Sequence, residues 1–179
     1  MNKSIFVVRH CKAVGQQPEA QLTEEGINQS LSLVRFFSKY NIDRIISSPF
    51  TRAIQSINPY AKKRNINIEI DNRLAERTLS NQSYHDWMEK LKKTFTDMDL
   101  KYDGGESSRE AQARIKDVID DIITSSFSNT IIVTHGNLMA LLLKNYIPEY
   151  GFNNWMALRN PDVYHIRWND GKYTVECIW

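Results

Sequence analysis

Short apolar runs alternate with longer segments of helical periodicity along this chain, and this alternation limits the folds it can adopt. Residues 4–8 and 130–134 are runs of mostly β-branched and apolar residues, as in strands buried on both faces. Helical spacing follows each strand-like run. We therefore expect an α/β protein, specifically a three-layer α/β/α sandwich. Its sheet should be mostly parallel with an antiparallel element at one edge.

The first half of the chain carries local signals for two strand-helix units. Thr23 is expected to cap a helix whose apolar residues recur at helical spacing as far as Phe37. Residues 44–48 predict a second strand. Ser48 is then expected to cap a second helix, with Pro49 at its first position. We expect this helix to run toward Arg64, kinked or divided by a proline at position 59.

The second half continues the alternation and ends differently. Residues 67–70 predict a strand, and residues 83–100, 107–127 and 137–146 predict helices around the strand at 130–134. Residues 163–168 and 173–179 flank Asn169-Asp170-Gly171, which is typical of a β-hairpin turn. This hairpin is the antiparallel element that we expect at the edge of the sheet.

The size and charge of the chain exclude several classes of protein. Its 179 residues predict a single domain over 1–179, without repeats or linkers, and a net charge of +2 gives no general case for nucleic-acid binding. The apolar runs 5–8 and 138–143 are too short for a signal peptide or a membrane span, so we expect a cytoplasmic protein with no membrane partner. Two cysteines and four scattered histidines lack disulfide or zinc spacing, so we expect no metal and no cofactor.

Polar side chains stand at three expected strand ends, where parallel sheets bind their ligands. They are Arg9-His10, Ser48-Pro49-x-x-Arg52 and His135-Gly136-Asn137. Arg52 lies in the first turn of a helix, where the helix dipole disfavours a cation, so an anion held there would explain it. The alternative is a surface arginine paired with a carboxylate. His135 alone could equally be a hydrogen-bonded core residue.

Taken together, two histidines and two arginines at neighbouring strand ends indicate a phosphoryl-transfer pocket. Imidazole is a nucleophile, and guanidinium groups bind phosphate oxygens in pairs. A second imidazole can donate a hydrogen bond to the equatorial oxygens.

These residues belong to a longer ordered pattern that resembles the histidine phosphatase superfamily, in its phosphoglycerate mutase-like acid phosphatase branch. The matching segments are Arg9-His10, Leu22-Thr23-x-x-Gly26, Ser47-Ser48-Pro49-x-x-Arg52-Ala53-x-Gln55-Ser56, Leu74-x-Glu76, Gly104-Gly105-Glu106-Ser107 with Arg114, and Val133-Thr134-His135-Gly136. Each segment alone is weak evidence, but their order along nearly the whole chain is specific.

The resemblance implies a role for each matching residue. His10 would attack phosphorus and form a phosphohistidine, while Arg9, Arg52 and His135 would hold the equatorial oxygens. Glu76 would protonate the leaving oxygen and then deprotonate the attacking water. The alternative for Glu76 is an ion pair with a neighbouring arginine at position 73 or 77.

Several positions depart from the family pattern or extend the site. Cys11 replaces the usual glycine after the nucleophile; it is either an unreactive small residue or a thiol of lowered pKa. Ala13 and Ser80 also depart from the usual residues. Gln16 stands where the family often has a phosphate-binding asparagine. We expect the phosphate and substrate to be bound by Arg9, Gln16, Arg52, Gly136 and Asn137.

Chain length favours hydrolysis over mutase chemistry, because the family's mutases have longer insertions and only residues 77–103 are available here as a cap. The expected substrate-reading side chains in this cap are Tyr84, His85, Trp87, Lys90, Lys92 and Lys93. We expect a phosphomonoesterase that acts on a small phosphorylated metabolite and releases inorganic phosphate. A phosphoprotein phosphatase, a mutase-type phosphotransferase and a non-catalytic phospholigand-binding module stay open. The terminal hairpin, with Trp168 and Trp179, is either a homodimer edge or part of the core.

Overall fold

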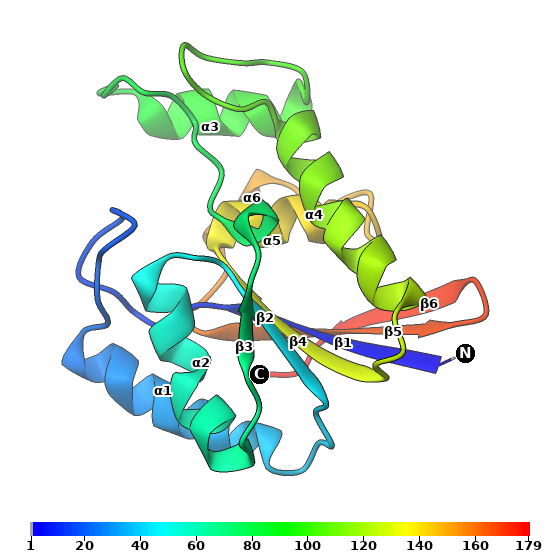
Figure 1. Cartoon of the computed structure of the whole chain (residues 1–179). Helices are drawn as coiled ribbons and strands as arrows, with labels where there is room; N and C mark the ends of the chain where they lie inside the picture. Colours follow the sequence, from blue (N-terminus) through cyan, green and yellow to red (C-terminus); the bar gives the residue numbers. More distant parts are fainter. Residues whose placement is uncertain (1) are drawn as a thin grey trace.

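A computed structural model describes residues 2–179, in which six strands form one mixed sheet (Figure 1). Across the sheet the strands are β3 (Ile68–Ile70), β2 (Arg44–Ser47), β4 (Asn129–Thr134), β1 (Asn2–Arg9), β5 (Asp162–Asn169) and β6 (Lys172–Cys177). The first four run parallel to one another, and β5 and β6 are antiparallel to their neighbours. The expected mostly parallel sheet with an antiparallel edge is confirmed.

Helices cover both faces of this sheet and complete the expected three layers (Figure 1). Along β1, Ile5 and Val7 point to one face, where they join a core with α4 (Ser108–Thr124) and α5 (Gly136–Lys144). Phe6 and Val8 point to the other face, toward α1 (Glu24–Phe37) and α2 (Thr51–Arg64). Because successive side chains of a strand alternate between faces, the apolar run in β1 supplies both cores.

Local sequence signals place several element ends. The Thr23 side chain accepts a hydrogen bond from the backbone N–H of Gly26 and so caps α1 as expected. The β5–β6 hairpin turns through Asp170 and Gly171, whose φ angles of 47° and 83° suit this residue pair. The C-terminal Trp179 packs its ring against Phe36 of the same chain, at 5.1 Å between centroids.

The predicted start of α2 was wrong, because the helix begins at Thr51 with Phe50 as its N-cap, not at Pro49 with Ser48. The Ser48 hydroxyl instead accepts a hydrogen bond from the backbone N–H of Phe50, ahead of the helix, and lies 2.7 Å from Nε2 of His135. Pro59 does not divide the helix, which is continuous from Thr51 to Arg64. A proline in a helix interior costs about 3 kcal/mol, and the buried face of α2 against the sheet and α1 offsets this cost.

The segments above the carboxyl ends of the strands differ most from the predicted secondary structure. Helix α3 (Trp87–Thr96) is shorter than the predicted 83–100, and the short helices η1 (Asn72–Leu74) and α6 (Phe152–Met156) were not predicted. The other elements begin and end within a few residues of their predicted bounds. Helix α3 stands above the carboxyl ends of the strands (Figure 1). No helix within residues 2–179 is both long and apolar enough to cross a membrane.

Candidate active site

The three polar strand ends meet at the centre of the sheet, because β2, β4 and β1 are neighbours. Arg9 pairs with Thr134 in the β1–β4 register. The backbone N–H of His10 donates to the Thr134 carbonyl over 3.0 Å, and that of Ser48 donates to the Val133 carbonyl over 2.9 Å. Parallel pairing therefore places His10, Ser48 and the residue after Thr134 side by side.

His10 is held in one orientation by two contacts at opposite sides of its ring. Its Nδ1 lies 2.7 Å from the Cys11 carbonyl oxygen, and its Nε2 lies 3.1 Å from Nε of Arg52. Since a guanidinium group can only donate, Nε2 must be the acceptor and Nδ1 must carry the proton. Burial, together with the Arg52 and Arg9 cations, lowers the pKa of His10 to about 3. The imidazole is thus neutral, with a lone pair on Nε2.

Arg52 is the second residue of α2, and only 1% of it is exposed. Its Nη1 donates to the carbonyl oxygens of Gln16 and Gln17 over 3.1 and 2.8 Å. The guanidinium also stacks on the ring of Phe50, 4.9 Å from its centroid. The alternative of a surface arginine is therefore wrong. Burial lowers the pKa of Arg52, and the Glu76 carboxylate opposes this shift.

His135 lies behind His10 and is fully buried. The two imidazole rings are 5.0 Å apart at their centroids, and Nε2 of His135 lies 2.7 Å from the Ser48 hydroxyl. Its Nδ1 makes no hydrogen bond within the described residues. Burial, with His10 and Arg52 nearby, holds the pKa of His135 well below 6.5, so this imidazole is neutral too.

Glu76 follows η1 and faces the N-terminus of α5. Its carboxylate accepts backbone hydrogen bonds from Arg77 (2.9 Å), Asn137 (3.1 Å) and Leu138 (3.0 Å). A helix N-terminus is a natural seat for a carboxylate. Within residues 2–179 Glu76 makes no ion pair, and Arg73 pairs instead with two aspartates, so the ion-pair alternative is wrong.

Arg9 lies against the start of α5. Its Nη1 donates to the Leu158 carbonyl over 2.6 Å, and its guanidinium passes close to Gly136. A Cβ at Gly136 would lie 3.1–3.2 Å from Cζ, Nε and Nη2 of Arg9, so only glycine fits there without displacing the guanidinium. Burial lowers the pKa of Arg9, while Glu76 and Asp162 raise it.

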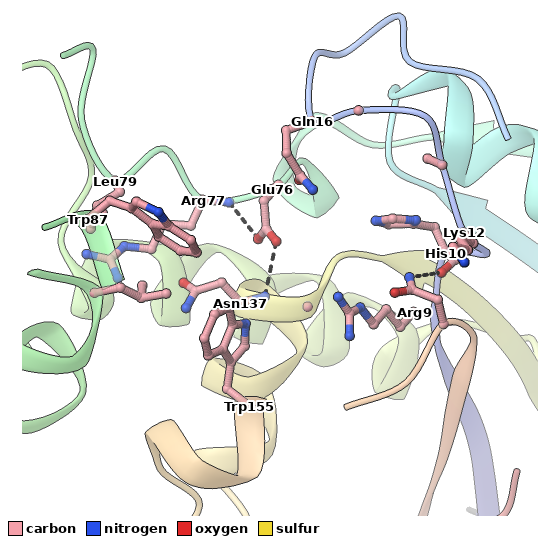
Figure 2. A pocket seen from close by; sticks show the side chains of 15 residues that line it. Arg9, His10, Lys12, Gln16, Glu76, Arg77, Leu79, Trp87, Asn137 and Trp155 are labelled. Atoms are coloured by element: carbon pink, nitrogen blue, oxygen red, sulfur yellow. Dashed lines mark hydrogen bonds between the residues drawn. The ribbon is translucent and has the colours of Figure 1, made fainter. Parts of the chain in front are cut away.

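Arg9, His10 and Glu76 border a cavity of about 450 Å³ (Figure 2). Its lining residues are Arg9, His10, Lys12, Ala13, Gly15, Gln16, Glu76, Arg77, Leu79, Trp87, Leu91, Gly136, Asn137, Trp155 and Asn160. Arg52 and His135 are not among them, since both are almost completely buried. Figure 2 shows Arg9 and His10 on one side of Glu76, and Trp87, Arg77 and Trp155 on the other.

Some predicted residues reach the cavity and others do not. Gln16 points its side chain toward Glu76 (Figure 2). Of the six cap residues expected to read the substrate, only Trp87 lines the cavity; Lys90, for example, lies over the rings of Tyr84 and Tyr102. Seven lining residues were not predicted from the sequence: Lys12, Gly15, Arg77, Leu79, Leu91, Trp155 and Asn160. No local pattern marks these side chains, since packing alone turns them inward.

Cys11 is a buried, unreactive thiol. Its side chain has no exposed surface and packs in the core beneath α1 and α2. Burial raises its pKa to about 11, so the alternative of a lowered pKa was wrong. Its backbone N–H donates to the Ser56 hydroxyl over 2.8 Å. The described residues contain no group of three or more His, Cys, Asp or Glu side chains that could hold a metal ion.

The fold and the cavity define an α/β sandwich with two histidines, two arginines and a glutamate gathered at the carboxyl ends of its central strands. A family model of the histidine phosphatase superfamily (branch 1) matches residues 5–178. The chain belongs to this superfamily, as the ordered motifs indicated.

Individual relatives are more distant. The chain is 26% identical over 152 residues to a Hydrogenobacter thermophilus protein named "putative phosphoserine phosphatase 2", with 76% of this chain and 75% of that protein covered. A mycobacterial glucosyl-3-phosphoglycerate phosphatase in complex with inorganic phosphate superposes with a TM-score of 0.80 at 20% identity, covering 99% of this chain and 96% of that one. A phosphoglycerate mutase of Bacillus anthracis superposes with a TM-score of 0.78 at 19% identity, over 99% and 92% of the two chains. These two structures share the fold.

Proposed function

We propose that this protein hydrolyses the phosphate monoester of a small phosphorylated metabolite through a phosphohistidine intermediate on His10, without a metal ion or cofactor. The observation that carries this proposal is the state of His10: a neutral imidazole whose Nδ1–H is anchored on the Cys11 carbonyl and whose Nε2 has a lone pair. A nucleophile needs that lone pair available at neutral pH.

In the first step, Nε2 of His10 attacks phosphorus and the P–O bond to the leaving group breaks. The electron pair passes to the leaving oxygen, which takes a proton from Glu76. The carboxyl group of Glu76 lines the same cavity as His10 and is held by three backbone N–H groups, so its position is defined. In the second step water attacks phosphorus, the N–P bond breaks, and Glu76 takes the proton of the water.

Cationic side chains around His10 stabilise the negative charge on the phosphoryl group. Arg9 lines the cavity, and Arg52 gives up its bond to Nε2 of His10 and donates to a phosphate oxygen instead. The neutral imidazole of His135 is the third hydrogen-bond donor to the phosphoryl group. Preorganised donors of this kind stabilise the transition state without reorganisation. We place Gln16, Gly136 and Asn137 beside the bound ester, because all three line the cavity.

The names of similar proteins support a small phosphorylated substrate. The relative from Hydrogenobacter is named for phosphoserine, and the mycobacterial structure is that of a glucosyl-3-phosphoglycerate phosphatase. A cavity of about 450 Å³ also suits a small molecule better than a protein side chain on a folded surface.

Rapid chemical quench with a ³²P-labelled phosphate ester tests the proposal. We expect a labelled protein whose phosphate is stable in base and released in acid, as a phosphoramidate should be. His10→Gln should show no label and no turnover while keeping its circular dichroism spectrum. Activity should persist in EDTA. Full turnover by His10→Gln, or loss of turnover on chelation, would sink the proposed mechanism.

A further inference from the structure

The cavity has two ends of different chemistry, with Glu76 between them (Figure 2). His10 and Arg9 form the end that would hold the phosphoryl group. Trp87 and Trp155 lie at the other end, beyond Glu76, whose protonated carboxyl group would protonate the leaving oxygen. The leaving group of the ester therefore has to lie against the two indoles.

The walls of this second end are mostly apolar. Leu79 and Leu91 complete the surface that Trp87 and Trp155 begin. A small polar leaving group would leave both indoles facing water, whereas an aromatic ring would cover them and gain ring-ring contact beyond its burial. The apolar wall of the cavity thus favours a leaving group with a flat, apolar ring.

One of the two indoles is held by a cluster of aromatic side chains. Phe95 of α3 lies 6.0 Å from Phe152 and 6.5 Å from Trp155 of α6, measured between ring centroids. Phe152 and Trp155 are 5.4 Å apart. This cluster joins the two helices that carry Trp87 and Trp155, so the ring-binding end is supported by packing across α3 and α6.

Two buried polar groups at the same end lack partners. Asn137 is 6% exposed, and both atoms of its side-chain amide make no hydrogen bond within residues 2–179. Arg77 is 7% exposed; its Nε and Nη1 donate to Glu106 and Thr94, but its Nη2 has no acceptor in the described chain. Unpaired buried polar atoms are costly, so a small rotation of either side chain toward a ring with hydrogen-bonding groups at its edge would be favourable.

We propose that the physiological leaving group carries an uncharged heteroaromatic ring, which lies against Trp87 and Trp155 with its polar edge toward Arg77 and Asn137. The inference rests on the proposed phosphatase function and specifies its substrate class. A cationic ring is disfavoured by the nearby guanidinium of Arg77. A ring of this kind with its sugar or methylene link fits a cavity of about 450 Å³.

Two matched pairs of esters test this substrate class. Benzyl phosphate and ethyl phosphate release alcohols of similar acidity, so their ratio of kcat/KM isolates the contribution of the ring. Adenosine 5′-monophosphate and ribose 5-phosphate differ by a heteroaromatic base. We expect each ring-bearing ester to exceed its partner at least tenfold, and O-phosphoserine to be slower than benzyl phosphate.

Substitutions at the named residues test whether these side chains cause the preference for ring-bearing esters. Trp87→Ala and Trp155→Ala should each lower the benzyl-to-ethyl ratio at least threefold, and Trp155→Phe should retain it. Asn137→Ala should lower the adenosine-to-ribose ratio more than the benzyl-to-ethyl ratio. Trp168→Ala, on the distant β5, is the control and should leave both ratios unchanged. Trp87 is 47% exposed, so its replacement is informative even if Trp155→Ala unfolds.

The possible results separate the two proposals. Ratios near one in the wild type, ratios unaffected by both tryptophan variants, or faster hydrolysis of O-phosphoserine would overturn the ring inference alone. If the wild type hydrolysed none of these esters, the proposed function itself would fail, and the inference with it.

Discussion

Nε of Arg52 donates a hydrogen bond of 3.1 Å to Nε2 of His10, and this contact defines the state of the candidate nucleophile. An arginine cannot accept a proton there, so the imidazole has to be the neutral tautomer with its proton on Nδ1. The arginine also occupies the lone pair of Nε2. In the proposed mechanism Arg52 has to release this contact before His10 can attack phosphorus.

Two substitutions of Arg52 should separate the contribution of its charge from that of its planar guanidinium group. Arg52→Lys keeps a cation but loses the planar fork, so we expect kcat to fall about 10²-fold or more, with Arg52→Ala lower still. Because the Arg52 cation helps to depress the pKa of His10, NMR titration of Arg52→Ala should show that pKa higher than in the wild type. Arg167→Ala, which removes an exposed ion pair with Glu176, should change neither quantity. Equal kcat for wild type and Arg52→Lys would contradict the proposed role.

Glu76→Gln should show a defect that depends on the leaving group. An alkoxide needs a proton as it departs, so we expect a loss of about 10²- to 10⁴-fold in kcat/KM with an alkyl phosphate, since kcat/KM reports the step in which the leaving group departs. The loss should be much smaller with p-nitrophenyl phosphate, whose phenolate leaves without a proton. Steady-state kinetics with both esters provides the measurement, and Glu69→Gln at the exposed pair with Arg44 is the control. A uniform loss with both esters would argue against general acid catalysis.

Gly136→Ala should weaken phosphate binding through Arg9. The new Cβ would lie 3.1–3.2 Å from the guanidinium, which is held on its other side by the Leu158 carbonyl, so Arg9 has to move. We expect the Kd for inorganic phosphate to rise about three- to tenfold in calorimetry, as for a weakened charged hydrogen bond. Gly151→Ala meets only ordinary contact at 3.6 Å and serves as the matched control. Unchanged phosphate affinity in Gly136→Ala would refute the placement of Arg9.

His165 should make the fold sensitive to acid. Its ring stacks on Phe6 within the sheet, and burial, with Arg167 nearby and Glu176 opposing, lowers its pKa to about 4. Between pH 6.5 and 4 the unfolded chain binds a proton at this residue that the folded chain does not, so stability falls as the pH falls. His165→Phe should reduce this slope by up to about 1.4 kcal/mol per pH unit.

Urea unfolding of wild type and His165→Phe at several pH values measures this slope. Above pH 7.5, where His165 is neutral in both states, the free energies of unfolding should differ by a constant amount. Equal slopes for the two proteins between pH 6.5 and 4 would mean that His165 does not titrate in this way.

The two cysteines should differ in their reaction with iodoacetamide. Cys177 is exposed, whereas Cys11 has no exposed surface and a pKa raised to about 11. Native protein should therefore be alkylated at Cys177 alone, and protein in denaturant at both positions, as mass spectrometry of peptides would report. Rapid alkylation of Cys11 in the native state would mean that the backbone after His10 is exposed.

Much of the fold could be predicted from local pattern. The strand at 130–134, the cap at Thr23 and the Asp170-Gly171 turn each depend on neighbouring residues only, and all three are confirmed. The cap at Ser48 and a division of α2 at Pro59 were not found, for the opposite reason. The buried face of α2 outweighs the proline, and the Ser48 hydroxyl bonds a histidine 87 positions away.

For the candidate site, the sequence by itself determined which chemical groups follow the strands, because parallel strands align their carboxyl ends whatever the loops do. Arg9, His10, Arg52, Glu76 and His135 were predicted as one group, and the tertiary structure brings Arg9, His10 and Glu76 to one cavity with Arg52 and His135 buried against His10. Only the tertiary structure decided that Arg52 bonds His10, that Cys11 is buried in the core, and that Trp87 and Trp155 line the cavity. Burial and proximity depend on packing between distant segments, and no spacing within one segment records them.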